Sequence, residues 1–313
     1  MMNHIPLAPP VPSSKVARPA VSVIIPTYKR PHLVGFAVQS ILSQDMTDFE
    51  VLVMDDCPEE PAEAAVREIG DSRVRYLKNP QNLGISGNLN RGIYESRGEA
   101  VFILHDSDLA KPTMVGEMYG LIQENPSTAY VHTGLEYIDD YGEVFQAHVG
   151  NYGRLTPGEI WLRRMLGMLA SNVCAMTMAP RAMYESYGLL DSNYGAYADV
   201  EWSIRMCLYG DVGYLPEPLL VMRDREPDHP LRAFQWGTYD LHIPMRKKYI
   251  PLVRNPFWRN LVRGKLRWEI ERALIINILS CLKHEQYQKL REGKKVLANY
   301  GIFVPKVVSA FIR

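Results

Sequence analysis

Short apolar runs alternate with segments of helical periodicity over roughly the first hundred residues of the chain. Residues 21–25, 49–54 and 100–104 are apolar and rich in β-branched side chains, which predicts buried parallel strands, and residues 73–77 predict another strand. Apolar side chains that recur every three or four residues then predict a helix: Val34, Ala37, Val38, Ile41 and Leu42. This alternation predicts an α/β fold with a mainly parallel sheet that helices cover on both faces.

The rest of the chain has a mixed pattern. Residues 79–87 are rich in Gly and Asn and predict a loop, which leads into a helical pattern that ends near residue 97. Periodicity predicts further elements, namely helices at 62–69 and 199–209 and strands at 129–138, 144–149, 212–215 and 219–222. Beyond residue 232 the pattern is helical. Because open α/β sheets bind ligands beyond the carboxyl ends of their strands, the polar residues that follow the strands are the candidates for function.

The composition is that of a folded globular protein, with 47% hydrophobic and 22% charged residues. No apolar run reaches the roughly 18 residues that a membrane-spanning helix needs. Residues 1–20 contain five prolines and lack the apolar core of a signal peptide, which predicts a flexible leader. The four cysteines lie far apart and form no C-x-x-C pair, which disfavours a zinc site or a disulfide framework and predicts a cytoplasmic protein.

The charge is distributed unevenly along the chain. Residues 232–313 contain 17 Lys and Arg against 5 Asp and Glu, whereas residues 1–231 contain 18 against 30. The basic residues surround aromatic ones, including Trp258 and Trp268, which predicts peripheral contact with anionic lipid. The alternatives are a solvated basic face or a homodimer contact through Leu274, Ile275, Ile278 and Leu279. Nucleic acid is not an expected partner, because no recognition motif accompanies the charge.

The sequence Asp106-Ser107-Asp108 directly follows the apolar run at residues 100–104. Two carboxylates one residue apart at a strand end can share a hard divalent cation, which prefers oxygen ligands. Mg²⁺ or Mn²⁺ in such a site keeps open positions for substrate phosphates. The alternative is a solvated turn or the cap of a helix ahead of Pro112, where Asp is favoured.

Asp55 and Asp56 end another predicted strand. One carboxylate here can accept a hydrogen bond from a base or a ribose hydroxyl, and the other is expected to be a structural residue of the turn. The Asn- and Gly-rich segment 82–92 opens a helix whose backbone amides could face a diphosphate, although a flexible loop is an alternative. The segment matches neither G-x-G-x-x-G nor a P-loop, which disfavours a dehydrogenase or an ATPase.

Asp199 begins a predicted helix that also carries Trp202. A partly apolar pocket would raise its pKa, which suits a general base that removes a proton from a hydroxyl group. Capping of the helix is an equally good explanation for an Asp at this position. His229 follows the last predicted strand and could complete a metal site or contact a diphosphate, although a lone His more often does neither.

The order of these motifs resembles that of the family-2 glycosyltransferases, which have the GT-A fold. The resemblance covers about residues 21–222, with the motifs in the same order and at matching spacings. The matching runs are VSVIIPTYKR (21–30), SILSQ (40–44), FEVLVMDD (49–56), Asn82-x-Gly84, Asn90-x-Gly92, FILHDSD (102–108), YADVEW (197–202) and YLPEPL (214–219).

The resemblance implies a nucleotide-sugar site formed by Pro26, Thr27, Tyr28, Arg30, Asp56, Asn82, Gly84, Asn90 and Asp106. In this site Arg30 would reach the phosphates and Asp56 would hold the base. Asp106 and Asp108 match the D-x-D motif, in which Mn²⁺ or Mg²⁺ bridges to the nucleoside diphosphate. His229 falls near a further metal or phosphate contact. Asp199 matches the acidic residue that deprotonates the acceptor in inverting members of the family.

The chain departs from the family pattern in three places. Many members have a further Asp where this chain has His105, which leaves open whether Asp106 or Asp108 is the closer metal ligand. Many have Glu where this chain has Ala198, which leaves Glu201 as an alternative base. The Q-x-x-R-W motif and membrane spans of processive synthases are missing, so the resemblance implies transfer of a single sugar.

The resemblance therefore implies a metal-dependent, inverting glycosyltransferase that moves one sugar from a nucleoside-diphosphate sugar, preferably a UDP-sugar, to a saccharide or lipid-linked saccharide. Such an enzyme would act in bacterial surface polysaccharide or glycoconjugate synthesis, peripherally on the inner face of the cell membrane. The alternatives are a sugar-nucleotide-forming nucleotidyltransferase and a catalytically silent binding subunit. The predicted organisation is a Rossmann-like GT-A domain at 21–231, divided into a nucleotide-binding half (21–110) and an acceptor half (111–231), and a basic helical extension at 232–313.

Overall fold

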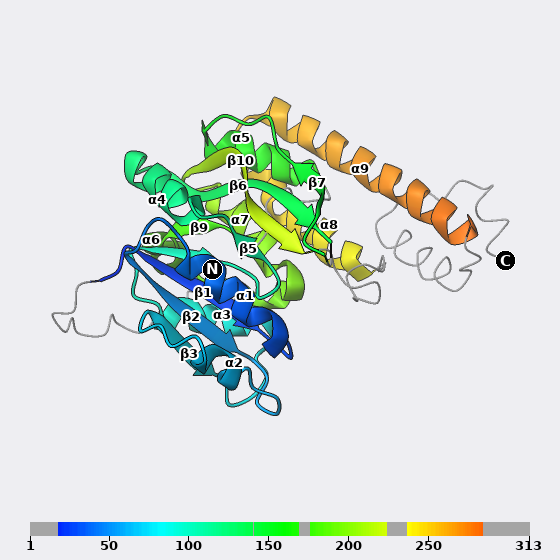
Figure 1. The fold of residues 1–313 in the computed structure, drawn as a ribbon. Coiled ribbons are helices and arrows are strands. Elements are labelled where there is room, and N and C mark those ends of the chain that lie inside the picture. Colours follow the sequence, from blue (N-terminus) through cyan, green and yellow to red (C-terminus); the bar gives the residue numbers. More distant parts are fainter. Residues whose placement is uncertain (1–17, 140, 169–175, 224–236, 284–313) are drawn as a thin grey trace. The chain divides into compact units, whose positions relative to one another are not determined.

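A computed structural model of the protein describes residues 18–139, 141–168, 176–223 and 237–283 (Figure 1). The chain divides into two compact units, which we call the sheet unit (Met1–Trp161 and Asn172–Asp224) and the helical unit (Leu162–Ser171 and Arg225–Arg313). The predicted GT-A domain at 21–231 differs from this division, because residues 162–171 group with the helical unit. The predicted boundary at residue 231 lies outside the described residues, as does most of the predicted leader.

The sheet unit is built on a mixed sheet with the strand order β3-β2-β1-β4-β9-β6-β10-β5. Its first half is parallel and contains the four strands that the apolar runs predict: β1 (Val21–Thr27), β2 (Phe49–Asp55), β3 (Val74–Lys78) and β4 (Ala100–Ile103). Every residue of β1 and β2 is buried, as expected for strands covered on both faces. The register pairs Thr27 with Asp55, so the polar carboxyl ends of these strands lie together.

The second half of the sheet is mixed. Its strands are β9 (Met178–Pro180), β6 (Thr128–Ile138), β10 (Asp211–Arg223), β5 (Leu109–Ala110), β7 (Val144–His148) and β8 (Leu155–Thr156). The predicted strands at 129–138 and 144–149 are confirmed as β6 and β7. The predicted strands at 212–215 and 219–222 are instead one strand, β10, with an irregular register between Leu215 and Leu220. Pro216 and Pro218 lack the backbone N–H that a regular ladder requires, so they interrupt the pairing without ending the strand.

Helices cover both faces of the parallel half. They are α1 (Pro31–Leu42), α2 (Glu63–Arg67) and α3 (Gly84–Glu95), whereas α4 (Met114–Glu124) packs on β6, β9 and β10 of the mixed half. Apolar residues of α1, α2 and α4 join one core with Val23 and Ile25, whereas α3 packs on the other face. There, a Cβ at Gly92 would lie 2.7 Å from the Ile24 side chain, so the glycine permits the close approach of α3 to β1. Helix α3 begins at Gly84, within the predicted loop, and α2 is shorter than its predicted range of 62–69.

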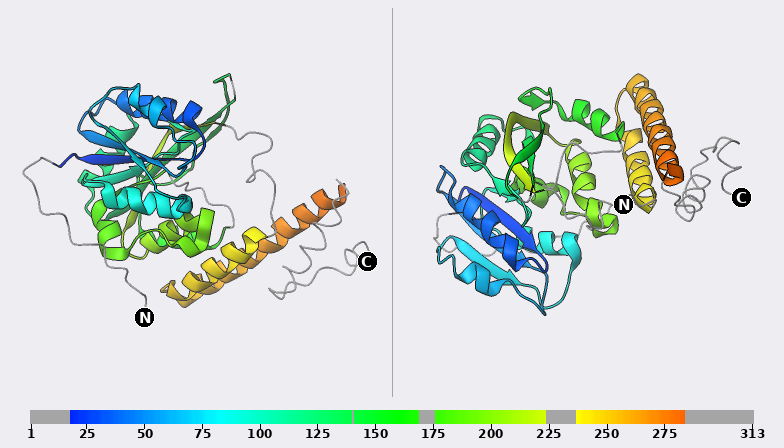
Figure 2. Two further views of the ribbon diagram at one scale, coloured as in Figure 1. Left: turned by 90° about the horizontal axis from the view of Figure 1, so that it is seen from below. Right: turned by 45° about the vertical axis from the view of Figure 1, so that its right-hand side comes forward.

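The remaining helices are α5 (Gly158–Leu166), α6 (Arg181–Tyr187), the 3₁₀ segment η1 (Ser192–Tyr197), α7 (Ala198–Met206), α8 (Gly237–Tyr249), the 3₁₀ segment η2 (Ile250–Leu252) and α9 (Pro256–Lys283). Helices α8 and α9 confirm the helical pattern of the basic region and belong to the helical unit, where they lie side by side (Figure 2). Among the helices of the described residues, none is long and apolar enough to span a bilayer.

Candidate active site

Asp106 lies just beyond the carboxyl end of β4 and is buried. The parallel pairing of β4 with β1 brings it to residues that are far away in the sequence. The Thr27 hydroxyl donates a hydrogen bond to Asp106 Oδ2 (2.9 Å), and the Arg30 guanidinium contacts Asp106 Oδ1 at 3.3 Å. Burial raises the pKa of Asp106, and the Arg30 charge and the Thr27 hydrogen bond oppose that shift. The structure thus brings together three of the predicted donor-site residues.

Asp108 is also buried, and its contacts join the end of β4 to the end of β10. The backbone N–H of Arg223 donates to Asp108 Oδ1 at 3.4 Å, and His105 Nδ1 lies 3.8 Å from Asp108 Oδ2. The N-cap of α4 is Thr113, and no side chain caps that helix. Capping of α4 therefore does not explain the two aspartates.

The carboxylates of Asp106 and Asp108 fit a hard divalent cation. Both are shielded oxygen donors at the sheet edge where α/β proteins bind ligands. A carboxylate has about four lone-pair sites, so the bonds from Thr27 and Arg30 leave Asp106 with acceptor capacity. The described ranges contain no group of three or more metal-binding side chains, so Mg²⁺ or Mn²⁺ would need ligands from water and a substrate phosphate. His229, the third predicted ligand, lies outside those ranges.

The two aspartates that follow β2 differ in their contacts. Asp55 accepts hydrogen bonds from the backbone N–H groups of Cys57 (2.9 Å) and Ala62 (2.6 Å) and from the Tyr76 hydroxyl (2.6 Å). Asp55 is therefore the structural residue of this turn. Asp56 Oδ1 accepts a bond from the Leu83 backbone N–H (2.8 Å), which ties it to the segment before α3. Its predicted contact with a base stays a prediction.

The two asparagines of the predicted nucleotide site hold backbone groups. Asn82 Oδ1 accepts a bond from the Gly84 N–H at 2.8 Å, and Gly84 adopts a φ of +69° that favours glycine. Asn90 makes two bonds to Leu190, donating to its carbonyl (2.8 Å) and accepting from its N–H (3.0 Å). These contacts give both asparagines a structural role, and their predicted contacts with a nucleotide stay predictions.

Residues 26–30 lead from β1 into α1 along the same edge. Pro26 and Thr27 are buried within the strand, whereas Tyr28 is 44% exposed. Lys29 adopts a φ of +57°, which is uncommon for a residue other than glycine. Its Nζ lies 5.3 Å from the centre of the Tyr28 ring. Sequence reasoning did not single out Lys29, because backbone conformation of this kind leaves no pattern in the residue types.

Asp199 lies in the first turn of α7, whose N-cap is Tyr197 and has no side-chain capping bond. Asp199 Oδ1 is shielded from solvent and has no hydrogen-bond partner in the described structure. Burial raises the pKa of Asp199 to about 6, and the backbone N–H groups of residues 199 and 200 oppose the shift only in part. An Asp at this helix start could be a general base or a helix cap. The surroundings of Asp199 favour a carboxyl group with a raised pKa over a cap.

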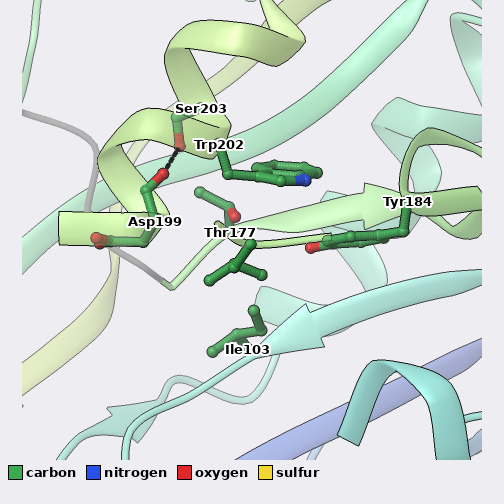
Figure 3. A pocket seen from close by; sticks show the side chains of 7 residues that line it. Ile103, Thr177, Tyr184, Asp199, Trp202 and Ser203 are labelled. Atoms are coloured by element: carbon green, nitrogen blue, oxygen red, sulfur yellow. Dashed lines mark hydrogen bonds between the residues drawn. The ribbon is translucent and has the colours of Figure 1, made fainter. Parts of the chain in front are cut away.

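A small cavity of about 10 Å³ adjoins Asp199 (Figure 3). It is lined by Ile103, Thr177, Tyr184, Leu190, Asp199, Trp202 and Ser203. Figure 3 shows Asp199 on one side and Tyr184 on the other, with Thr177 and Ile103 between them. Ile103 ends β4 three residues before Asp106, so the cavity and the D-x-D motif belong to the same end of that strand.

Residues 187–190, which we call the cavity loop, contribute Leu190 to this lining. Arg205 holds the loop through the carbonyl groups of Tyr187 and Leu189, and the second bond is 2.6 Å long. Arg205 also pairs with Glu201 at 3.2 Å, and Glu201 is only 1% exposed. Glu201, the alternative base, is thus committed to a structural ion pair. Its i, i+4 spacing from Arg205 was the sequence signal for this pair.

Comparison with known proteins agrees with this arrangement. The sequence profile described as Glycosyl transferase family 2 matches residues 22–187, which is more than half of the chain. A "GalNAc(5)-diNAcBac-PP-undecaprenol beta-1,3-glucosyltransferase" from Campylobacter jejuni is 38% identical over 94 residues, 29% of this chain and 30% of that protein. A "UDP-Glc:alpha-D-GlcNAc-diphosphoundecaprenol beta-1,3-glucosyltransferase" from Escherichia coli is 30% identical over 89 residues, 28% of this chain and 35% of that protein. The matched stretch spans about a third of each relative.

The fold is similar to that of S. aureus TarS residues 1–349, solved in complex with UDP-GlcNAc. The TM-score is 0.65 at 17% sequence identity, and the match covers 93% of this chain and 83% of that one. This likeness confirms the predicted GT-A fold. Together with the profile match, it identifies the chain as a member of glycosyl transferase family 2.

Proposed function

We propose that the protein transfers a single sugar from a UDP-sugar to a hydroxyl group of a saccharide acceptor, with inversion at the anomeric carbon. Membership of glycosyl transferase family 2 supports sugar transfer in polysaccharide or glycoconjugate synthesis. The proposal of inverting transfer to a hydroxyl group rests on one observation, the position of the cavity beside Asp199. A carboxyl group with a raised pKa, one oxygen of which is shielded from solvent, lies against the end of the strand that leads into Asp106 and Asp108.

In the proposed donor site, Asp106 and Asp108 hold Mn²⁺ or Mg²⁺. When bound, such an ion supplies positive charge that stabilises the departing diphosphate. Arg30 adjoins Asp106 and adds a second positive charge at the same edge, and Asp56 is proposed to accept a hydrogen bond from the base. We prefer a UDP-sugar because the structurally similar TarS was solved with UDP-GlcNAc and with UDP.

Asp199 is proposed as the base that accepts the proton of the acceptor hydroxyl. An ordinary Asp is a weak base, and a pKa of about 6 makes the carboxylate a stronger proton acceptor that is still mostly ionised at neutral pH. The apolar lining beside it, which includes Ile103 and Trp202, is the physical cause because it desolvates the charged form. Glu201 is less suited to this role, because Arg205 neutralises it.

The proposed acceptor is a lipid-linked saccharide. The names of the C. jejuni and E. coli relatives both contain an undecaprenol-linked sugar. An acceptor of this kind would require the enzyme to work peripherally at the inner face of the cell membrane. Homodimer formation through the apolar residues of the basic region stays a prediction.

The test is identification of the product. The protein is incubated with Mn²⁺, a panel of UDP-sugars and short-chain lipid-linked saccharide acceptors, and the product is analysed by mass spectrometry and by the NMR coupling of its anomeric proton. We expect one added sugar whose anomeric configuration is opposite to that of the donor. A retained configuration would contradict the role of Asp199. Formation of a UDP-sugar from UTP and a sugar phosphate would indicate a nucleotidyltransferase, and no reaction with any donor would favour a silent binding subunit.

A further inference from the structure

Helix α9 carries two apolar faces. At about 100° per residue, the side chains of Phe257, Leu261, Trp268, Ile275 and Leu279 all fall within an arc of about 40°. Each of these five side chains is more than half exposed, and we call them the α9 stripe. A second set of apolar residues lies on roughly the opposite side of the helix and is buried, namely Val262, Leu266, Ile270 and Cys281.

The buried face accounts for the packing of α9 within the helical unit. Helix α8 runs alongside α9, as both views of Figure 2 show. Asn277 on α9 donates a hydrogen bond to the Tyr239 hydroxyl on α8 at 3.2 Å. Tyr239, Ile243 and Tyr249 of α8 are buried. Because one apolar face is enough for this packing, the α9 stripe requires a separate explanation.

Positive charge lines the edge of the stripe. Lys265, Arg272 and Lys283 fall about 20° to 80° from its residues on the helical wheel. The Arg272 guanidinium lies 5.5 Å from the centre of the Trp268 ring. Residues 237–283 as a whole contain ten Lys and Arg against three Asp and Glu. The surface that α9 presents therefore combines aromatic and aliphatic side chains with a strong excess of cations.

We propose that the α9 stripe lies on the surface of an anionic lipid bilayer, with the helix axis parallel to the membrane plane. Trp, Phe and Leu on one side and flanking Lys and Arg are the combination that anchors interfacial helices, because the apolar side chains enter the headgroup region and the cations meet the lipid phosphates. The stripe extends from Phe257 to Leu279, which corresponds to about 33 Å of helix.

The positive charge beside the α9 stripe favours an anionic bilayer over a second copy of the chain as its partner. Two stripes that faced each other would bring the cationic edges of both copies together, with Glu269 and Glu271 as the two acidic residues of α9 to offset them. Both glutamates already pair within the helix, to Arg272 at 3.1 Å and to Arg267 at 2.8 Å. An anionic lipid surface has the opposite charge and needs no such compensation.

The proposal deepens the proposed function and rests on it in one respect, because a lipid-linked acceptor gives the enzyme a reason to meet the membrane. Lipid binding itself is measured without turnover. A protein that binds vesicles but transfers no sugar would contradict the proposed function alone, and one that transfers sugar but binds no vesicles would contradict this inference alone.

The experiment is flotation of the full chain with vesicles of phosphatidylcholine, alone or mixed with phosphatidylglycerol. We expect binding to the mixed vesicles that weakens as salt is raised, and little binding to phosphatidylcholine alone. The double variant Leu261→Ser and Trp268→Ser should bind at least about tenfold more weakly, because it removes two of the five anchors. The matched control is Phe36→Ser, which removes an aromatic residue on α1 that is 62% exposed, and it should bind like the wild type.

Several results would overturn the proposal. They are the absence of wild-type binding to mixed vesicles, equal binding by the double variant, or equal loss in the Phe36→Ser control. Sedimentation velocity separates a further outcome, in which the wild type is a dimer, the double variant is a monomer and neither binds vesicles. That result would assign the stripe to a second copy. Thermal unfolding of each variant checks that the fold is retained, as expected for exposed residues.

Discussion

Asp106 and Asp199 are two carboxyl groups of the same unit whose pKa is raised by loss of solvent, but their hydrogen-bond and charge partners differ. Asp106 receives a hydrogen bond from Thr27 and lies against the positive charge of Arg30. Asp199 has one oxygen without a hydrogen-bond partner among the described residues, beside an apolar cavity that raises its pKa to about 6. A carboxylate that is stabilised by a cation and a hydrogen bond, as in Asp106, suits a role that needs a negative charge, such as metal binding. A carboxylate without such partners, as in Asp199, suits the gain and loss of a proton.

The largest expected effect comes from removing the proton acceptor. Asp199→Asn should lower the rate of sugar transfer by about 10³-fold, because the amide cannot accept the acceptor proton. Initial rates of product formation at pH 7.5 measure the effect. Asp191→Asn is the matched control, because Asp191 caps η1 and does not line the cavity, and it should transfer sugar at nearly the wild-type rate. Transfer by Asp199→Asn within tenfold of the wild type would remove Asp199 as the base.

The next largest effect is expected at Asp106. Asp106→Asn should weaken the binding of UDP in the presence of Mn²⁺ by about 10- to 100-fold, because it removes a charged ligand of the proposed ion. Calorimetric titration with UDP measures the affinity, and the same loss is expected for the wild type in EDTA. Wild-type affinity that is indifferent to both EDTA and the substitution would contradict metal-dependent donor binding.

A third effect concerns the pH dependence of stability at Asp199. The pKa of Asp199 is raised in the folded protein, so the folded state holds its proton more tightly than the unfolded chain does. This contribution to stability is present below the ordinary pKa near 4 and is lost as the pH rises through about 6. The free energy of unfolding of Asp199→Asn should therefore match that of the wild type at pH 4 and exceed it by about 3 kcal/mol at pH 7 in urea unfolding. Equal stabilities of variant and wild type at both pH values would contradict the raised pKa of Asp199.

The smallest effect tests the cavity loop. Asn90→Ala removes both bonds to Leu190, so water should reach Asp199 more easily and its pKa should fall from about 6 toward the ordinary value. The acidic limb of the pH–rate profile should then move to lower pH, while the maximal rate falls several-fold because the base is weaker. Asn125→Ala is the control, because Asn125 donates to the Leu121 carbonyl at the end of α4 (3.0 Å) and does not line the cavity. A lower transfer rate with an unchanged acidic limb of the pH–rate profile would show that Asn90 has a structural role only and does not affect the pKa of Asp199.

The parallel half of the sheet and its acidic strand ends were predictable from the sequence, because their signals are local. Apolar runs end in Asp55-Asp56 and Asp106-Ser107-Asp108, and the strands occur where the runs do. β9 was not predicted, since three residues are too few for a periodic pattern. The cavity loop was also missed, because Asn90 and Leu190 meet across 100 residues and amide residue types do not indicate their partners.

The roles of single residues within a motif depend on contacts that residue types alone leave open. Asp55 and Asp56 are adjacent and chemically identical. Asp55 nevertheless accepts hydrogen bonds from the turn that follows β2, whereas Asp56 accepts one from the segment before α3. The same holds for Asp199 and Glu201 on α7, where only Glu201 has a cation within reach in the described structure. Packing assigns these roles, because burial and partner geometry set the pKa and the availability of each carboxylate.

The division between a donor site at Asp106 and a proton acceptor at Asp199 is tested most directly by measuring donor binding and sugar transfer together in Asp106→Asn and Asp199→Asn. UDP affinity with Mn²⁺ is determined by calorimetry, and sugar transfer is determined on the same preparations. We expect that both variants lose transfer, that Asp106→Asn also loses UDP binding, and that Asp199→Asn binds UDP as the wild type does. A loss of UDP binding in Asp199→Asn equal to that in Asp106→Asn, or retained transfer in either variant, would contradict the division between a donor site and a proton acceptor.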